Sequence, residues 1–239
     1  MASQPARPIA FVAGATGYAG REVVRALAER GVDTVAHVRP DSPRLAEWRQ
    51  RITDLGARAD ATPWSTPAMS ARLAALRPTH VFALLGTTRA RAAAAARTGH
   101  ASADYEAVDY GLSVLLLRAA AALAPAPRFV YLSSIGASLT TGNAYLRVRG
   151  RVETEVMGSG LPYLIVRPSF ITGPDRDESR PAERVSAAVL DAGTRLLAGL
   201  GARRLRARYR PRSGAELAAA IVRLSLEPGP SRIVEAEQL

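Results

Sequence analysis

The sequence has 239 residues, of which 48% are hydrophobic and 22% charged. This composition suits a globular protein with a core of its own and excludes a disordered chain. The formal net charge is +11, but all 32 basic residues are arginine, and charge without a recognised module does not indicate a nucleic-acid-binding protein. The absence of cysteine excludes disulfides, thiolate metal ligands and a cysteine nucleophile.

The start of the chain lacks the basic flank and long apolar stretch of a secretory signal. The apolar run 112–127 is interrupted by Arg118 and Pro125 and is too short to cross a bilayer. We therefore expect a soluble, cytoplasmic protein that binds neither membranes nor nucleic acid. No linker-like stretch divides the chain, so we expect one domain over 1–239, in which 169–239 forms a small substrate-side region.

Short apolar runs that end at glycine, serine or proline alternate with segments of helical apolar spacing. The runs predict strands at 9–13, 34–38, 57–59, 80–85, 128–132 and 163–167, with one more at 205–209. The intervening segments predict helices at 20–30, 44–52, 69–76, 105–123, 144–157, 182–197 and 215–226. This alternation predicts an α/β fold with a doubly wound parallel sheet, the Rossmann fold.

A glycine-rich turn, Gly14-Ala-Thr16-Gly17-Tyr18-Ala-Gly20, joins the first predicted strand to the first predicted helix. In this context Gly14 permits the tight turn, Gly17 lets the backbone approach a pyrophosphate, and Gly20 lets the helix pack against the sheet. The helix N-terminus offers unpaired N–H groups and the positive end of the helix dipole to the phosphates. We expect this turn, with Thr16 and Tyr18 inside it, to bind a dinucleotide.

The end of the second strand bears on the choice of dinucleotide. An NAD enzyme places an acid there, whereas this chain has Arg39, whose guanidinium suits the 2′-phosphate of NADP(H). The nearby Asp41 leaves NAD(H) open. Asp60, after the third strand, is a candidate acceptor for the adenine amino group, and a turn aspartate is the alternative interpretation.

Further motifs follow in a fixed order: Leu85-Gly86-Thr87 after the fourth strand, Val108-Asp109-Tyr110, Tyr131-Leu-Ser133-Ser134 after the fifth, Tyr145-Leu-Arg-Val-Arg149, Val166-Arg-Pro168, and Asp-Arg-Asp-Glu-Ser-Arg-Pro at 175–181. In order and spacing, 11–226 resembles the atypical short-chain dehydrogenases of the Tat-interacting-protein-like, NmrA-like group. The glycine spacing G-x-x-G-x-x-G is also typical of the atypical and extended branches of that superfamily.

The resemblance implies roles for individual residues. Ser134 would orient a substrate carbonyl, with Ser133 as the neighbouring alternative, and Tyr145 would exchange the proton. In that superfamily a lysine four residues after the tyrosine holds the ribose and lowers the pKa of the tyrosine, but this chain has Arg149 there. Arginine keeps the charge but cannot relay a proton.

The resemblance also extends the expected cofactor contacts to the end of the fourth strand and beyond. The expected cofactor-binding residues beyond the turn, Arg39 and Asp60 are Leu85, Gly86, Thr87, Pro168, Tyr145 and Arg149.

Two functions from different classes follow from these motifs. The first is an NADPH-dependent oxidoreductase that transfers a hydride to a small carbonyl substrate. The second is an NADP(H)-binding regulator or assembly factor with a protein partner and little activity, which Arg149 favours. The scattered His37, His80 and His100 show no metal-ligand spacing, so no metal is expected.

Overall fold

The computed structural model describes residues 7–86, 105–169, 171–172 and 212–239. The predicted helix 182–197, the predicted strand 205–209 and the motif at 175–181 lie outside this range, as do Thr87 and His100.

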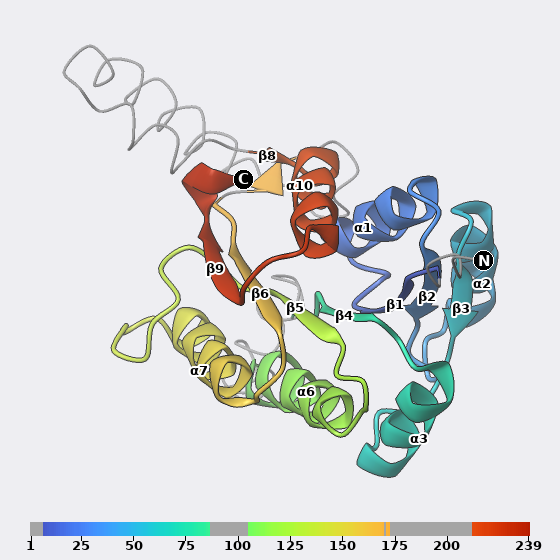
Figure 1. Ribbon diagram of the computed structural model, residues 1–239, viewed down its shortest axis with the longest axis horizontal. Helices are drawn as coiled ribbons and strands as arrows, with labels where there is room; N and C mark the ends of the chain where they lie inside the picture. Colours follow the sequence, from blue (N-terminus) through green and yellow to red (C-terminus); the bar gives the residue numbers. More distant parts are fainter. Residues whose placement is uncertain (1–6, 87–104, 170, 173–211) are drawn as a thin grey trace, which may run out of the picture.

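Within the described residues, seven parallel strands form one sheet in the order β3-β2-β1-β4-β5-β6-β9 (Figure 1). The strands are β1 (Ile9–Ala13), β2 (Asp33–His37), β3 (Arg58–Asp60), β4 (His80–Ala83), β5 (Arg128–Leu132), β6 (Tyr163–Arg167) and β9 (Arg232–Glu235). A short pair, β7 (Ile171–Thr172) and β8 (Arg212–Ser213), lies apart from this sheet. The order reverses direction between β1 and β4, which is where ligands bind in doubly wound sheets.

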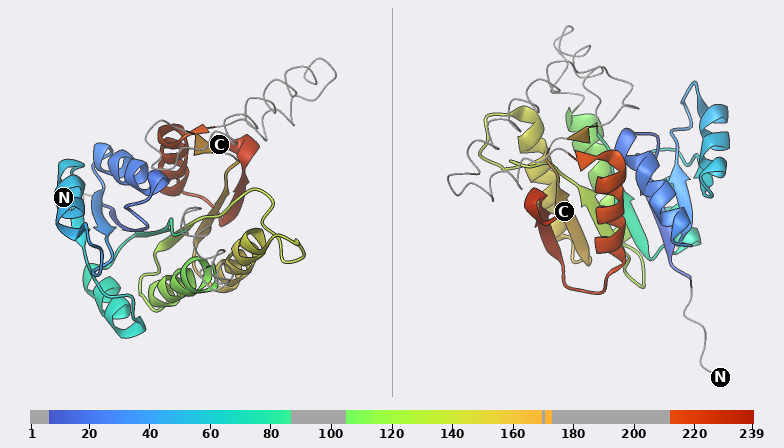
Figure 2. Two further views of the ribbon diagram at one scale, coloured as in Figure 1. Left: turned by 180° about the vertical axis from the view of Figure 1, so that it is seen from behind. Right: turned by 90° about the horizontal axis from the view of Figure 1, so that it is seen from above.

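Helices cover both faces of the sheet, as the views in Figure 2 show. One face carries α1 (Tyr18–Glu29), α2 (Leu45–Asp54) and α10 (Gly214–Leu226). The other carries α3 (Thr66–Leu76), α6 (Ser113–Ala121) and α7 (Ala144–Gly158). The strands are apolar on both sides because each side packs against one of two buried clusters. The predicted doubly wound Rossmann fold is confirmed.

Besides the short strands β7 and β8, two elements differ from the sequence prediction. The segment predicted as a single helix over 105–123 begins as a π-helix, η1 (Tyr105–Leu112), and continues as α6. The strand β9 was not predicted, because its four residues hold only Ile233 and Val234 as apolar signal. It adds to the sheet beside β6, and a 3₁₀ turn, η2 (Ala236–Gln238), follows it.

The C-terminal part of the expected substrate-side region contributes to the core. Helix α10 packs along α1, and its apolar residues belong to the same buried cluster. Together with β9, it extends the main sheet and its helical cover, so 212–239 stabilises the dinucleotide-binding fold itself.

Candidate functional site

The glycine turn lies between β1 and α1 and is held against the end of β4. Gly14 has a φ of +84°, and a Cβ there would come within 2.4 Å of the Leu84 carbonyl oxygen. A Cβ on Gly20 would lie 2.0 Å from the Gly14 carbonyl oxygen, so the helix could not start so close to the strand. The fold itself therefore requires both glycines.

Gly17 differs from these two because the fold restricts it less. Its φ of −74° is ordinary, and a Cβ would meet only the Gly14 carbonyl oxygen, at 3.3 Å. Gly17 is the exposed N-cap of α1 and makes no side-chain cap, whereas Ser65, Asn143 and Ser213 cap α3, α7 and α10. Bare backbone at an uncapped helix N-terminus without acidic residues in its first turn fits the pyrophosphate of a dinucleotide.

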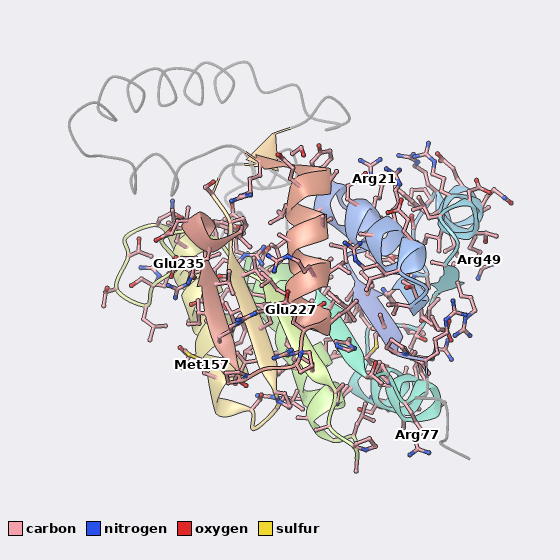
Figure 3. The ribbon with its side chains drawn as sticks, turned by 45° about the horizontal axis from the view of Figure 1, so that its top comes forward. Arg21, Arg49, Arg77, Met157, Glu227 and Glu235 are labelled. Atoms are coloured by element: carbon pink, nitrogen blue, oxygen red, sulfur yellow. The ribbon has the colours of Figure 1, made fainter. Side chains whose placement is uncertain are left out.

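The other two residues of the turn lie on either side of Gly17. Thr16 is half-buried. Tyr18 fastens α1 to α10, since its hydroxyl accepts a hydrogen bond from the Gly214 N–H at 3.4 Å and its ring occupies the space that a Cβ on Gly214 would need. Figure 3 shows Arg21 at the same end of α1, beside α10. The start of α1 is thus braced by the C-terminal helix.

The end of β2 is followed by the residues expected to select the cofactor, and the end of β3 holds the candidate acceptor for the adenine amino group. Arg39 is half-exposed, and its Nη1 lies 3.5 Å from Asp41 Oδ2, so the two rival determinants face one another. Asp60 is the last residue of β3 and is buried; its carboxylate accepts from the Thr62 N–H and from Arg72 Nε. Burial alone would raise the pKa of Asp60, but these bonds outweigh it and lower that pKa.

The end of β4 meets α7 through Arg149. The Arg149 guanidinium is buried and donates to the Leu85 and Leu132 carbonyl oxygens at 3.0 and 2.9 Å, linking the ends of β4 and β5. Gly86 leaves room for it, because a Cβ there would lie 2.8 Å from Arg149 Nη2. Arg149 also donates to Asp109 Oδ1 at 2.7 Å.

Tyr145, in the first turn of α7, lies over this guanidinium. The Arg149 Cζ atom is 5.0 Å from the centre of the Tyr145 ring. The Tyr105 ring also packs against the Tyr145 ring, with 5.6 Å between the two ring centres. The structure therefore brings Tyr145 and Arg149 together, as the four-residue spacing on one helix predicts.

The two candidate serines have different surroundings. The Ser133 hydroxyl is buried and donates to Glu153 Oε1 at 2.5 Å, whereas Ser134 is half-buried and its hydroxyl makes only a 3.5 Å contact with the Ile135 carbonyl oxygen. The Ile135 N–H donates to the carbonyl oxygen of buried Pro168 at 3.0 Å, so Pro168 lies beside the serines. This geometry favours Ser134 as the hydroxyl open to a ligand.

A partly buried ionic network, which was not predicted from the sequence, lies beside Ser133. Glu153 on α7 accepts from Ser133 and from Arg167 at the end of β6, and Arg167 also donates to Glu235 at the end of β9 at 2.8 Å. Figure 3 shows Glu235 at that end of the strand. The Glu153 and Glu235 carboxylates raise the pKa of Arg167. In the sequence, this network is indicated only by Glu153, which follows Arg149 by four residues and so lies on the same face of the helix.

The remaining candidates among the described residues have structural contacts. His37 Nε2 lies 2.7 Å from the Thr62 carbonyl oxygen, and His80 Nε2 lies 3.1 Å from that of Ser225. Burial lowers the pKa of both histidines. The described part of the chain contains no group of three or more His, Asp or Glu side chains arranged to hold a metal ion.

Comparison with known proteins decides the family. A family model described as NAD(P)H-binding matches residues 14–190, from the glycine turn onwards. The chain belongs to this NAD(P)H-binding family. Its match begins at Gly14, the residue whose positive φ forms the turn, and the predicted resemblance to atypical short-chain dehydrogenases is confirmed.

Relatives and solved structures agree with this assignment. The chain is 34% identical over 194 residues to "Protein fmp52, mitochondrial" of Aspergillus clavatus, covering 78% of this chain and 76% of that protein. The Aspergillus niger protein of the same name is 32% identical, covering 72% and 70%. UDP-glucose 4-epimerase from Thermotoga maritima shares the fold with a TM-score of 0.64 at 18% identity, covering 96% of this chain and 79% of that one. The Bordetella bronchiseptica enzyme WbmH, solved in complex with NAD⁺, has a TM-score of 0.63 at 16% identity, covering 94% and 74%.

The names of these relatives correct one expectation. The sequence predicted a cytoplasmic protein from the lack of a recognisable targeting segment, but the relatives are named as mitochondrial proteins, which contradicts that prediction. Among the described helices, none is long and apolar enough to span a bilayer.

Proposed function

We propose that this protein is an NADPH-dependent oxidoreductase that reduces a small carbonyl compound. The observation that carries the proposal is a continuous series of contacts at the carboxyl ends of the central strands. The Gly14 turn lies against Leu84, Arg149 joins Leu85 to the end of β5, and Tyr145 lies over Arg149. These contacts support a single site that combines the proposed nucleotide-binding turn with the Tyr145 phenol.

Different residues of this site would bind the cofactor, bind the carbonyl oxygen and donate the proton. The bare backbone at Gly17 would hold the pyrophosphate at the start of α1, and the backbone of Leu85 and Gly86 would line the path of the dinucleotide towards Tyr145. The bound nicotinamide supplies the hydride. Ser134 would hydrogen-bond the carbonyl oxygen of the substrate, and Tyr145 would give its phenolic proton to that oxygen as the carbon gains the hydride, leaving an alcohol.

A preference for NADPH is supported by Arg39. Its guanidinium is half-exposed at the end of β2, and its contact with Asp41 is a surface pair of the kind that contributes little to stability. A 2′-phosphate can therefore take Asp41's place beside Arg39, since phosphate accepts charge-assisted hydrogen bonds from a guanidinium.

The test is to incubate the protein with NADPH and a panel of small aldehydes and ketones and to measure the oxidation of NADPH from the loss of its absorbance. Wild-type protein should turn over at least one class of carbonyl, and Tyr145→Phe should remove that activity while retaining NADPH binding. Turnover that survives Tyr145→Phe would refute the assignment of the proton donor. Tight NADPH binding without turnover of any carbonyl would favour the second function.

That second function is an NADP(H)-binding regulator with a protein partner. The observation in its favour is that Arg149 stands where a lysine is expected, and that its guanidinium donates its hydrogen bonds to Asp109 and to backbone carbonyl oxygens. Affinity capture with and without NADPH tests it, and a partner retained only in the presence of the cofactor would support it.

A further inference from the structure

A buried ion pair lies beneath the ring of the proposed proton donor. Arg149 Nη2 is 2.7 Å from Asp109 Oδ1, and the two side chains are 5% and 0% exposed. Asp109 comes from the π-helical segment η1 and Arg149 from α7, so the pair joins two helices that are separate in the sequence. Removing either side chain would leave the other charge buried without this partner, which is costly.

Arg149 is fixed in place by more than this pair. It donates to the carbonyl oxygens of Leu85 and Leu132 and, at 3.2 Å, to the buried Tyr131 hydroxyl. Burial alone would lower the pKa of Arg149, but its interactions with Tyr131, Tyr145 and Asp109 raise it, so the guanidinium stays charged. A guanidinium held by four acceptors could not swing towards a ribose without leaving Asp109 unpaired.

The charge of this guanidinium matters at Tyr145. A cation that lies about 5 Å from the centre of a phenol ring favours the phenolate when nothing opposes its charge. The Asp109 carboxylate, in direct contact with the same guanidinium, opposes that effect. The described groups around Tyr145 and Arg149 are Tyr105 and Asp109 on η1 and Tyr131 on β5. Burial raises the pKa of Tyr131 to about 12, so among these described groups the charges are those of Arg149 and Asp109.

We propose that Asp109 is a positioning residue that holds Arg149 under the Tyr145 ring and opposes the effect of the Arg149 charge on the Tyr145 phenol. Arg149, which stands where the superfamily has a lysine, is thereby paired with the negative charge of Asp109. This inference rests on the proposed function, in which Tyr145 protonates the carbonyl oxygen. It assigns a function to Asp109, which lies forty positions before Arg149 in the sequence.

The test follows the ionisation of Tyr145 directly. Phenolate absorbance is titrated with pH in each variant, and the same variant carrying Tyr145→Phe is subtracted to isolate this tyrosine from the others. Asp109→Asn removes the counter-charge and keeps the shape, so the Tyr145 phenolate should form at lower pH, with an ionisation constant about tenfold larger or more. In the paired variant Asp109→Leu with Arg149→Met, both charges are gone, and the phenolate should form at the wild-type pH.

A matched control comes from Glu153 on α7, the helix that also carries Tyr145 and Arg149. Glu153→Gln also removes a buried carboxylate that pairs with an arginine, but its partner is Arg167, so the Tyr145 titration should not move. A purely structural role for Asp109 predicts lower stability in Asp109→Asn with an unshifted titration, and that result would overturn the proposal. Should Asp109→Asn fail to fold, the paired variant decides: phenolate formation at higher pH than in the wild type would show that the arginine charge was reaching Tyr145.

The titration also separates this inference from the proposed function. Where carbonyl turnover is found, the pH profile of kcat should move to lower pH in Asp109→Asn. Expected titrations together with no turnover in the wild type would refute the oxidoreductase but leave the charge control of Tyr145 intact. Turnover with an unshifted titration would refute the charge control alone.

Discussion

Valine in place of Gly17 should separate cofactor binding from folding. A Cβ at this position has one neighbour within 4 Å, the Gly14 carbonyl oxygen at 3.3 Å, and the φ of −74° is ordinary for any residue. The change requires the Gly14 carbonyl group to shift slightly, and it replaces glycine by an apolar residue at an N-cap. The free energy of unfolding should therefore fall by about 1 kcal/mol or less.

The effect on binding should be larger. The valine side chain would stand where a pyrophosphate oxygen approaches the backbone, and a charged hydrogen bond lost there is worth about 1.5–3 kcal/mol. The dissociation constant for NADPH, measured by calorimetry, should rise by roughly ten- to a hundredfold. Urea denaturation of the same sample reports the stability.

Two glycines provide the controls for this experiment. Gly142→Val adds the same side chain where a Cβ meets nothing within 4 Å, and should leave NADPH affinity unchanged. Gly20→Val should prevent folding, because its Cβ would lie 2.0 Å from the Gly14 carbonyl oxygen. A folded Gly17→Val protein that binds NADPH as tightly as the wild type would refute the placement of the pyrophosphate at this turn.

Four further predictions concern the cofactor preference, the two serines, Arg149 and His37. Wild-type protein should bind NADPH about tenfold or more tightly than NADH, and Arg39→Asp should reverse the order; equal dissociation constants for the wild type would contradict it. Ser134→Ala should lower kcat by about a hundredfold with little change in stability, whereas Ser133→Ala should lower the free energy of unfolding by about 1–2 kcal/mol; kinetics and urea denaturation giving the opposite pattern would exchange their roles. Arg149→Lys should lower the free energy of unfolding by about 1–3 kcal/mol, because an ammonium cannot reach the four acceptors of the guanidinium fork; an unchanged urea midpoint would count against this. Burial lowers the pKa of His37 below its ordinary value of 6.5, so the unfolded chain binds its proton first and stability should fall as pH drops below about 6.5; His37→Gln should weaken that dependence in denaturation measured at several pH values, and an identical slope would exclude the histidine.

The sequence by itself determined the backbone plan of this protein. Short apolar runs ending at glycine or serine predict buried parallel strands, and the spacing of Gly14, Gly17 and Gly20 between a strand and a helix predicts the nucleotide turn. These features depend on neighbours within a few residues, and such local preferences were enough to predict the fold. The family was predicted from the resemblance that the motifs over 11–226 carry. Local signals fell short where the apolar run was short, as in β9, and where helical spacing could not reveal the wider turn of η1.

The tertiary structure alone decided how the site's side chains are paired. Nothing in the spacing of Asp109 and Arg149 shows that they form a buried ion pair, and nothing near Ser133 or Ser134 shows which hydroxyl is bonded to Glu153. These pairings join residues that are 20 to 40 positions apart. They exist because parallel strands bring their carboxyl ends to one edge of the sheet, where the packing of α7 against η1 and β5 determines which polar groups meet and which remain open to a ligand.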